Sequence, residues 1–257
     1  MNALPPSIKC AVFDMAGTTV DDVIDGEPLV SVAMRAAFAQ IVPELPGGPL
    51  DATEIDAVRG LEKRDALKRL YVARQQSATG ADEVAHCSQS DDVIVQELYS
   101  SFKKQLVANL PRLQAEIEGA SQCFAALRQR GVKVFVGSGF PPDAVDTIVG
   151  ALGWEGKIDG SFSSASLGHG RPHPAMIHEA MRRSGLDPGS QEDARTVVKI
   201  GDTVADVEEG HNAKCWVVAV CTGTQPRSKL AAARPPPHFI VPSVANVPEL
   251  FSAADAR

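Results

Sequence analysis

Short apolar runs alternate with amphipathic stretches along most of the chain. The apolar runs predict buried β-strands at residues 9–13, 132–136, 196–200, 216–220 and 239–241. Helical patterns lie between these runs, for example at residues 120–130 and 174–184. This alternation of strand and helix predicts an α/β fold, in which helices cover a parallel sheet.

The segment from about residue 23 to residue 110 departs from this alternation. It offers only helix-like patterns, at residues 29–41, 53–58, 61–74 and 91–110. Asp51 or Thr53 is placed to cap the second of these helices. We therefore expect a core domain of residues 1–22 and 111–257, interrupted by a helical insertion at residues 23–110.

Composition narrows the range of functions. The formal net charge of −7 argues against nucleic-acid and membrane-surface partners, because either usually requires a concentrated basic face. A small anionic substrate stays compatible, since a local site can be positive. No apolar run approaches the roughly 20 residues that span a bilayer, and residues 1–9 lack the pattern of a secretory signal. We therefore expect a cytoplasmic protein.

The cysteines give no sign of a metal site or a disulfide framework. They are odd in number and widely scattered: Cys10, Cys87, Cys123, Cys215 and Cys221. We expect them to be buried, reduced thiols.

Four polar clusters are assigned to the ends of strands. They occupy residues 14–21, 137–139, 170–172 and 201–206. In a parallel sheet the carboxyl ends of the strands share one edge, so these clusters should converge there. Together they supply a carboxylate nucleophile, a hydroxyl with backbone amides, a guanidinium, and carboxylates able to hold Mg²⁺.

Single members of these clusters also have ordinary structural interpretations. Asp206 could cap a helix, and Ser138 could be a turn residue before one. Arg171 alone would be typical of a surface ion pair, and Asp21 and Asp22 of a solvated turn. The functional interpretation therefore depends on the series and not on any one residue.

The order and spacing of the clusters resemble the motifs of the haloacid dehalogenase superfamily. Asp14 matches the first acidic motif, Ser138 the Ser/Thr motif, Arg171 the basic residue, and Asp202 with Asp206 the Gly-Asp-x-x-x-Asp motif. The resemblance covers nearly the whole chain. It implies a Rossmann-like core with a mobile helical cap domain inserted after the first strand.

The resemblance also implies a role for each residue. Asp14 would attack phosphorus in line and form an aspartyl-phosphate that water later hydrolyses. The Mg²⁺ ligands would be the side chains of Asp14 and Asp202 and the backbone carbonyl of Ala16, with Asp206 in support. The phosphate would be bound by Ser138, by Arg171 and by the backbone near Gly17, Thr18 and Gly139.

Ala16 stands where phosphatases of this superfamily usually carry a second aspartate, two positions after the nucleophile. That aspartate protonates the departing alcohol, a contribution of about 10² to 10⁴ in rate. The sequence motif Asp-x-Ala-Gly-Thr-Thr-Val-Asp at residues 14–21 resembles that of phosphonoacetaldehyde hydrolase, or phosphonatase, and its phosphonatase-like relatives. In that family the leaving group is carbon, and an acid that protonates an alcohol is unnecessary.

The same resemblance assigns a role to a lysine of the cap. In phosphonatase a cap lysine forms an imine, or Schiff base, which accepts the electrons of the broken carbon–phosphorus bond. The segment at residues 60–65 resembles the family's Gly-Leu-x-Lys and places Lys63 at that position, although Arg59 replaces a methionine and Ala66 a histidine. Lys63 also lies in a charge run typical of a solvated helix. Nearby arginines would favour the neutral amine of Lys63, and nearby acids would oppose it. The sequence leaves open which effect is larger.

Three functions follow. The first is a Mg²⁺-dependent, phosphonatase-like hydrolase of phosphonoacetaldehyde or a similar small carbonyl phosphonate. The alternatives are a phosphomonoesterase of a small metabolite and, in another class, a catalytically silent scaffold. The family also implies homodimerisation through the cap.

Overall fold

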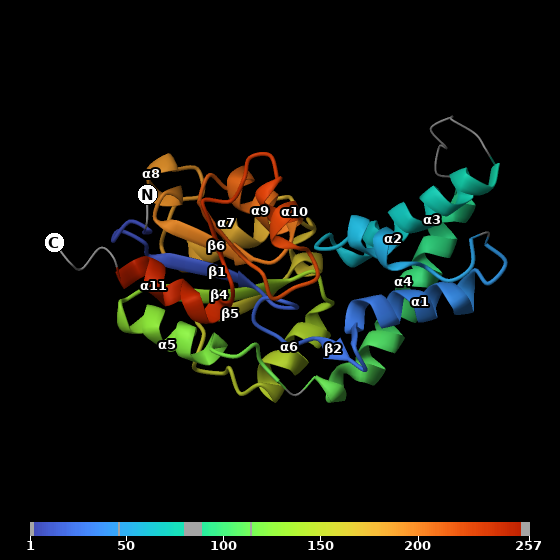
Figure 1. Ribbon diagram of the computed structural model, residues 1–257, viewed down its shortest axis with the longest axis horizontal. Coiled ribbons are helices and arrows are strands. Elements are labelled where there is room, and N and C mark those ends of the chain that lie inside the picture. The colour runs from blue at the N-terminus through green and yellow to red at the C-terminus, as the bar shows by residue number, and fades with distance from the viewer. Residues whose placement is uncertain (1–2, 46, 80–88, 114, 253–257) are drawn as a thin grey trace. The chain divides into compact units, whose positions relative to one another are not determined.

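The chain folds into two compact units. The computed structural model describes residues 3–45, 47–79, 89–113 and 115–252. The sheet unit contains residues 1–21 and 114–257, and the helical unit contains residues 22–113 (Figure 1). The units therefore divide after residues 21 and 113, against expected boundaries after residues 22 and 110.

The sheet unit is built on six parallel strands in the order β5-β4-β1-β6-β7-β8. The strands are β1 (Cys10–Asp14), β4 (Lys133–Ser138), β5 (Gly160–Ser163), β6 (Val197–Gly201), β7 (Trp216–Val220) and β8 (Phe239–Val241). Every residue of β1 and β6 is buried, because both strands are central and both faces of the sheet are covered. The predicted α/β class with a parallel sheet is confirmed.

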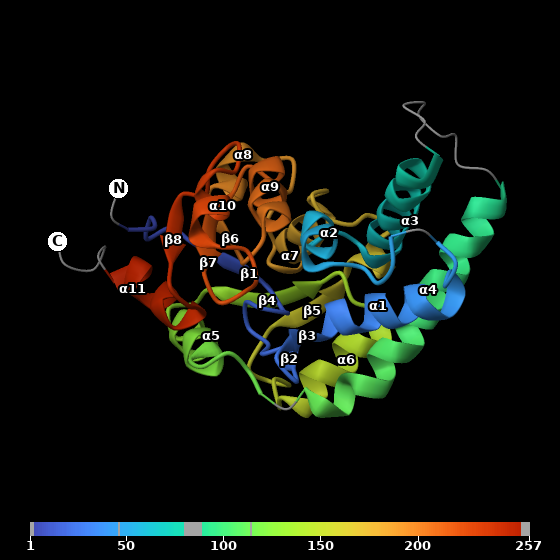
Figure 2. The ribbon, with the colours of Figure 1, turned by 45° about the vertical axis from the view of Figure 1, so that its right-hand side comes forward.

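Helices cover the two faces of this sheet (Figures 1 and 2). One face carries α7 (Ala175–Arg183), α8 (Gln191–Ala194), α9 (Val204–Asn212) and α10 (Arg227–Ala231), and the other carries α5 (Ala120–Gln129), α6 (Pro142–Ala151) and α11 (Val247–Ser252). Alternate residues of β1 point to opposite faces. Val12 joins a core cluster with Met176 of α7, whereas the Phe13 ring meets the Phe124 ring of α5 edge-on at 5.3 Å.

All five predicted strands are present, and two of them have the predicted limits. The strand β5 was not predicted, because it has four residues at the sheet edge and only Phe162 among them is large and apolar. The cluster at residues 170–172 follows β5 and a 3-10 helix, η2 (Ser164–Leu167). It therefore belongs to a longer connection than the other clusters do.

The helical unit contains α1 (Leu29–Ile41), α2 (Ala52–Ala57), α3 (Lys63–Thr79) and α4 (Gln89–Asn109), followed by a 3-10 helix, η1 (Leu110–Arg112). Asp51 caps α2 in a capping box with Glu54, as one of the two sequence alternatives predicted. The expectation of helices alone was wrong, since β2 (Val23–Ile24) and β3 (Glu27–Pro28) pair as an antiparallel hairpin. Strands of two residues are too short to produce a recognisable alternation.

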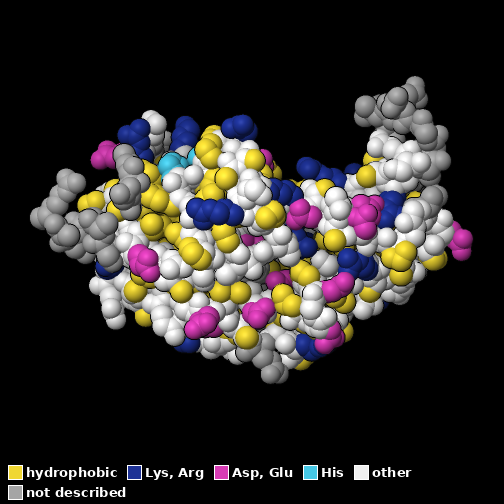
Figure 3. Space-filling view, viewed as in Figure 1, with side chains coloured by type: hydrophobic (Ala, Val, Ile, Leu, Met, Phe, Trp, Pro, Cys, Tyr) yellow, Lys and Arg dark blue, Asp and Glu magenta, His cyan; other side chains and the backbone are white. Residues whose placement is uncertain are grey.

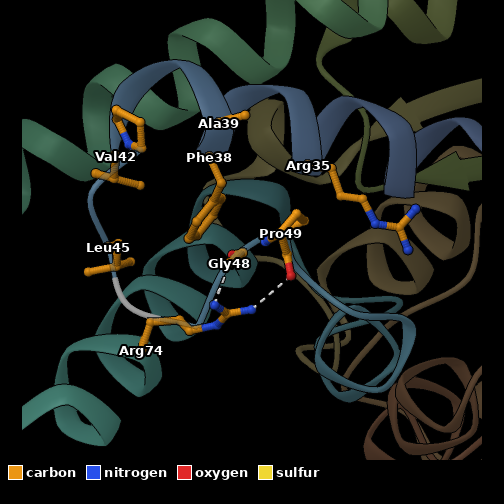
Figure 4. A pocket seen from close by; sticks show the side chains of 9 residues that line it. Arg35, Phe38, Ala39, Val42, Leu45, Gly48, Pro49 and Arg74 are labelled. Atoms are coloured by element: carbon orange, nitrogen blue, oxygen red, sulfur yellow. Dashed lines mark hydrogen bonds between the residues drawn. The ribbon is translucent and has the colours of Figure 1, made fainter.

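A pocket of about 200 Å³ lies between α1, the loop that follows it, and α3 of the helical unit (Figure 4). Phe38 and Leu45 contribute apolar surface, and Arg74 donates hydrogen bonds to the carbonyls of Gly48 and Pro49. Arg74 also pairs with Glu54. Its guanidinium is therefore committed to the protein and is not available to bind an anionic substrate.

Three cysteines of the sheet unit are buried, as expected. Burial raises the pKa values of the Cys10, Cys123 and Cys215 thiols to about 12. Cys221 is only partly buried and is also free, and Cys87 lies outside the described residues. The three buried thiols are therefore poor nucleophiles.

One face of the molecule carries charged side chains of both signs. Figure 3 shows basic side chains interspersed with acidic ones on the face in view. In the part of the chain that the structure describes, no helix is both long and apolar enough to cross a membrane.

Candidate active site

Three adjacent strands bring the predicted polar residues to one edge of the sheet. Asp14 ends β1 and is in register with Gly137 of β4, so Ser138 lies one residue further along the next strand. Asp202 comes directly after β6, the other neighbour of β1. Asp14, Ser138 and Asp202 are all buried. The convergence follows from the common direction of the strands.

Arg171 joins two of the carboxylates. Its Nη1 donates to Oδ1 of Asp14 at 2.6 Å and also to Oδ1 of Asp206. The Arg171 side chain is only 3% exposed, so the simple alternative of a surface ion pair is wrong. Among the described residues its Nε has no hydrogen-bond partner. A buried donor of this kind fits an additional anionic ligand such as a phosphate oxygen.

Asp202 is held by the turn that follows β1. Thr18 donates its hydroxyl to Oδ1 of Asp202 at 2.9 Å. Gly17 has φ of +77°, and a Cβ added there would lie 2.8 Å from Oδ2 of Asp202. A Cβ at Gly223 would approach the same oxygen to 1.8 Å. Glycine is therefore required at both positions to leave room for this carboxylate.

The backbone amides near the start of this turn are already engaged. The Gly17 amide donates to the Val20 carbonyl at 3.0 Å, and the Thr18 amide donates to the Met15 carbonyl at 3.1 Å. A phosphate cradle at these two amides would have to replace bonds that close the turn. Ala16 lies half-buried in the same turn and forms a backbone bridge with Val20.

Ser138 and Gly139 are buried at the end of β4. The Ser138 hydroxyl accepts a hydrogen bond from the Phe140 amide at 3.1 Å, which is the turn geometry that the simpler alternative predicted. Its O–H group can still donate to another acceptor. The turn interpretation and the phosphate-binding interpretation are therefore compatible.

Asp206 combines the two roles that its sequence position suggested. It forms a capping box with Thr203 at the start of α9, and its Oδ2 accepts from the Thr203 amide at 3.2 Å and hydroxyl at 2.5 Å. Its Oδ1 faces Arg171 and also lies 3.0 Å from Nζ of Lys199. Helix capping thus fixes the carboxylate that orients Arg171.

Sequence reasoning missed a second buried ion pair beside Asp206. Lys199 of β6 and Glu209 of α9 are both 0% exposed, and Lys199 Nζ lies 2.9 Å from Oε2 of Glu209. The available signal was a lysine inside an otherwise apolar strand run. Such a residue is rarely buried without a partner.

Burial and charge act in opposite directions on the carboxylates. Burial raises the pKa of Asp14, although the Arg171 guanidinium opposes that effect. Burial also disfavours ionisation of Asp206, but the charges of Arg171 and Lys199 outweigh it and lower its pKa. The site thus contains one carboxylate that resists ionisation and one that is strongly held in the ionised form.

A divalent cation fits this donor set. Asp14, Asp202 and Asp206 each offer a carboxylate oxygen, and these atoms lie within 4.8 Å of one another. Hard oxygen donors suit Mg²⁺, Ca²⁺ and Mn²⁺. Counting Glu209, the cluster contains four carboxyl groups and the two cationic groups of Arg171 and Lys199, so full ionisation leaves two negative charges for a cation to offset.

Lys63 belongs to the helical unit and begins α3. It is buried, and its Nζ donates to the Leu61 carbonyl at 3.2 Å. Arg64 and Asp65 beside it are exposed, so the alternative of a fully solvated charge run does not hold for Lys63 itself. Arg59 donates to the Ser31 hydroxyl at 3.1 Å.

Carboxylates that gather around a buried guanidinium, at the carboxyl edge of a parallel sheet, are suited to holding a cation and a phosphoryl group. Comparison with known families makes the assignment specific. A family model of haloacid dehalogenase-like hydrolases matches residues 8–214. The chain belongs to this family and is a hydrolase.

Individual relatives agree with the family. The chain is 32% identical to a phosphonoacetaldehyde hydrolase of Bacillus cereus, over 84% of this chain and 77% of that enzyme. A phosphonoacetaldehyde hydrolase-like protein from Oleispira antarctica has a similar fold, with a TM-score of 0.70, 20% identity, and coverage of 99% of this chain and 96% of that one. A β-phosphoglucomutase from Clostridium difficile also shares the fold, with a TM-score of 0.68, 14% identity, and coverage of 97% and 100%. The fold therefore does not by itself select the substrate.

Proposed function

We propose that the protein is a Mg²⁺-dependent hydrolase that cleaves the carbon–phosphorus bond of phosphonoacetaldehyde or a related small carbonyl phosphonate. The observation that carries the proposal is Ala16, two residues beyond a buried, Arg171-bound Asp14. A methyl group cannot protonate a departing alcohol, so a carbon leaving group suits this site better than an ester oxygen. The identity of 32% to a phosphonoacetaldehyde hydrolase supports the same substrate class.

The first covalent step that we assign takes place on Lys63, which we place in the cap domain. Its neutral amine attacks the substrate carbonyl, and with one proton taken from solvent the carbonyl oxygen leaves as water, which produces a protonated imine. The buried position of Lys63 supports this role, because an imine formed there is kept away from bulk water. The protonated imine then acts as the electron acceptor for bond cleavage.

The second step takes place on Asp14. Arg171 binds Oδ1, and Oδ2 is the oxygen that we assign to in-line attack on phosphorus. The carbon–phosphorus bond breaks, and its electron pair neutralises the imine as an enamine. Arg171 Nε and the Ser138 hydroxyl hold phosphoryl oxygens during this transfer.

The remaining steps regenerate both residues. Water hydrolyses the aspartyl-phosphate to phosphate and Asp14, while the enamine takes a proton and a second water hydrolyses the imine to acetaldehyde and Lys63. Asp14 and Asp202 would hold Mg²⁺ with the Ala16 carbonyl, and Asp206 would support them. The ion would offset the negative charge between nucleophile and phosphoryl group. The overall reaction consumes one water, because imine formation releases one.

Phosphate release provides the direct test. Phosphonoacetaldehyde and a panel of small phosphate esters are each incubated with the enzyme and Mg²⁺. The proposal expects release from the phosphonate and a lower rate with every ester. Release from an ester alone, with none from the phosphonate at high enzyme concentration, would replace the proposal with a phosphomonoesterase.

Borohydride reduction separates the imine route from other routes. Reduction during turnover should attach the two-carbon product to Lys63, as a mass addition on the peptide that contains it. Lys63→Arg should abolish phosphonate cleavage, whereas Lys68→Arg on the exposed part of the same helix should retain it. Active turnover without any addition at Lys63 would exclude this lysine as the electrophile.

A further inference from the structure

A line of alternating charges extends from the nucleophile into the core of the sheet unit. Asp14 binds Arg171, Arg171 binds Asp206, Asp206 faces Lys199, and Lys199 faces Glu209. The two distances that involve Lys199 are 3.0 Å to Asp206 and 2.9 Å to Glu209. The proposed mechanism uses only the first three of these residues.

We propose that Lys199 and Glu209 are positioning residues of the active site. Lys199 shares the Asp206 carboxylate with Arg171, and together with Glu209 it sets the attraction of the site for a divalent cation. This inference rests on the proposed function, from which it takes the cation site and the phosphate-binding role of Arg171.

The geometry around Asp206 explains how Lys199 acts on Arg171. Thr203 holds Oδ2 of Asp206, so the carboxylate cannot rotate freely. Oδ1 is divided between Arg171 and Lys199. Without the lysine, Oδ1 would attract Arg171 alone and draw its guanidinium away from Asp14. Lys199 therefore balances the two carboxylates that compete for one nitrogen, Nη1.

The packing of α9 brings Glu209 to this lysine. A Cβ at Gly210 would lie 2.5 Å from Cγ2 of Val217 and 3.2 Å from Cβ of Lys199. The helix thus approaches β6 and β7 at a distance that requires glycine. Glu209, which precedes Gly210 in α9, forms an ion pair with Lys199. Neither carboxylate oxygen of Glu209 has a hydrogen-bond partner among the described residues.

A purely structural role explains this pair poorly. Buried ion pairs are often no more stabilising than apolar side chains of similar volume, and good ones satisfy their remaining oxygens with hydrogen bonds. Glu209 does not meet that condition within the described residues. Its charge is better explained by its effect on the neighbouring groups, since Lys199 alone would make the site less attractive to a cation.

The charge count gives opposite expectations for the two single variants. With Lys199 and Glu209 both ionised as an ion pair, Lys199→Met makes the site more negative by one charge, and Glu209→Gln makes it less negative by one. Because a divalent cation responds to the net charge of its surroundings, the first variant should bind it more tightly and the second more weakly. A general structural defect would weaken binding in both.

Manganese binding tests these expectations without a substrate. Free Mn²⁺ is measured by electron paramagnetic resonance during titration of the metal-free full-length protein. Lys199→Met should lower the Kd for Mn²⁺ about tenfold, and Glu209→Gln should raise it about tenfold, within the range seen for outer ligand partners. Lys133→Met removes an exposed lysine that pairs with Asp159 and should leave the Kd unchanged.

The double variant Lys199→Met/Glu209→Gln separates positioning from folding. It has the wild-type net charge and no unpaired buried ion, so its Tm and its Mn²⁺ Kd should return close to the wild-type values. Asp206 still lacks Lys199, so inorganic phosphate should bind to the Mn²⁺-loaded double variant about tenfold more weakly than to wild type.

Each outcome decides between the alternatives. Opposite shifts in the single variants, with weak phosphate binding in the double variant, support the inference. Shifts of the same sign, or wild-type phosphate affinity in the double variant, overturn it and leave the proposed function intact. If the wild-type protein binds no Mn²⁺, the proposed cation site fails and this inference fails with it.

Discussion

The turn after β1 allows a sharp test of how the site holds Asp202, a proposed cation ligand. Gly17 has φ of +77°, and an alanine Cβ there would lie 2.8 Å from Oδ2 of Asp202 and 3.0 Å from Cα of Gly223. Gly156 has nearly the same backbone conformation, with φ of +79°, but a Cβ there would meet nothing within 4 Å. Gly156→Ala is therefore a matched control for Gly17→Ala.

The two substitutions share one energetic cost and differ in another. A left-handed conformation costs an alanine about 1 to 2 kcal/mol relative to glycine, in both variants. For a domain of this size that amounts to a decrease in Tm of about 2 to 8 °C. Only Gly17→Ala also forces Asp202 to move and strains its 2.9 Å hydrogen bond from Thr18. A displaced ligand of this kind should weaken cation binding by about 10- to 100-fold.

Two measurements on each variant decide the matter. Thermal unfolding gives the shared backbone cost, and Mn²⁺ titration gives the effect on Asp202. We expect similar decreases in Tm and a loss of Mn²⁺ affinity in Gly17→Ala alone. Equal Mn²⁺ affinity in the two variants would refute the proposal that Gly17 leaves room for Asp202 as a cation ligand.

Three further predictions concern charge and capping. Asp14→Asn should abolish turnover yet unfold within a few degrees of wild type in a thermal melt, and retained turnover would remove Asp14 as nucleophile. Burial raises the pKa of Asp14 above its ordinary value of 3.8, so its ionisation opposes folding. In EDTA the Tm of Asp14→Asn should therefore exceed that of wild type by an amount that grows as the pH rises above 3.8, and a constant difference would contradict this. Asp51→Ala should destabilise the helical unit by about 1 kcal/mol in urea unfolding, because the α2 capping box loses the bond from the Glu54 amide to the Asp51 side chain, whereas Glu44→Ala in the exposed loop after α1 should have a smaller effect.

Much of the core was determined by the sequence alone. The apolar runs are long enough to identify five of the six strands, and a strand that ends in Asp14 needs no tertiary information to place that carboxylate at its carboxyl end. Because parallel strands share a direction, the convergence of Asp14, Ser138 and Asp202 also follows from local patterns. Helix α1 was predicted with its observed limits, because its apolar periodicity is continuous.

The arrangement within the site was decided only by the tertiary structure. Thr18 and Asp202 are 184 residues apart, and Arg171 and Asp14 are 157 apart, so no local pattern reports their contacts. The sequence left Asp206 as either a helix cap or a metal-supporting acid, whereas its two oxygens allow one carboxylate to cap α9 and orient Arg171 together.

The strands could be predicted because local sequence specifies the periodicity of a segment and the direction of its strand. The ion pairs could not, because charge compensation depends on which side chains are brought together by packing. Lys199 is unremarkable as one polar residue in an apolar strand. It faces Asp206, and it acquires Glu209 as a second partner because Gly210 lets α9 approach β6 closely. The sequence thus determined where Asp14 and the other motif residues lie, and the tertiary structure decided which charges surround them.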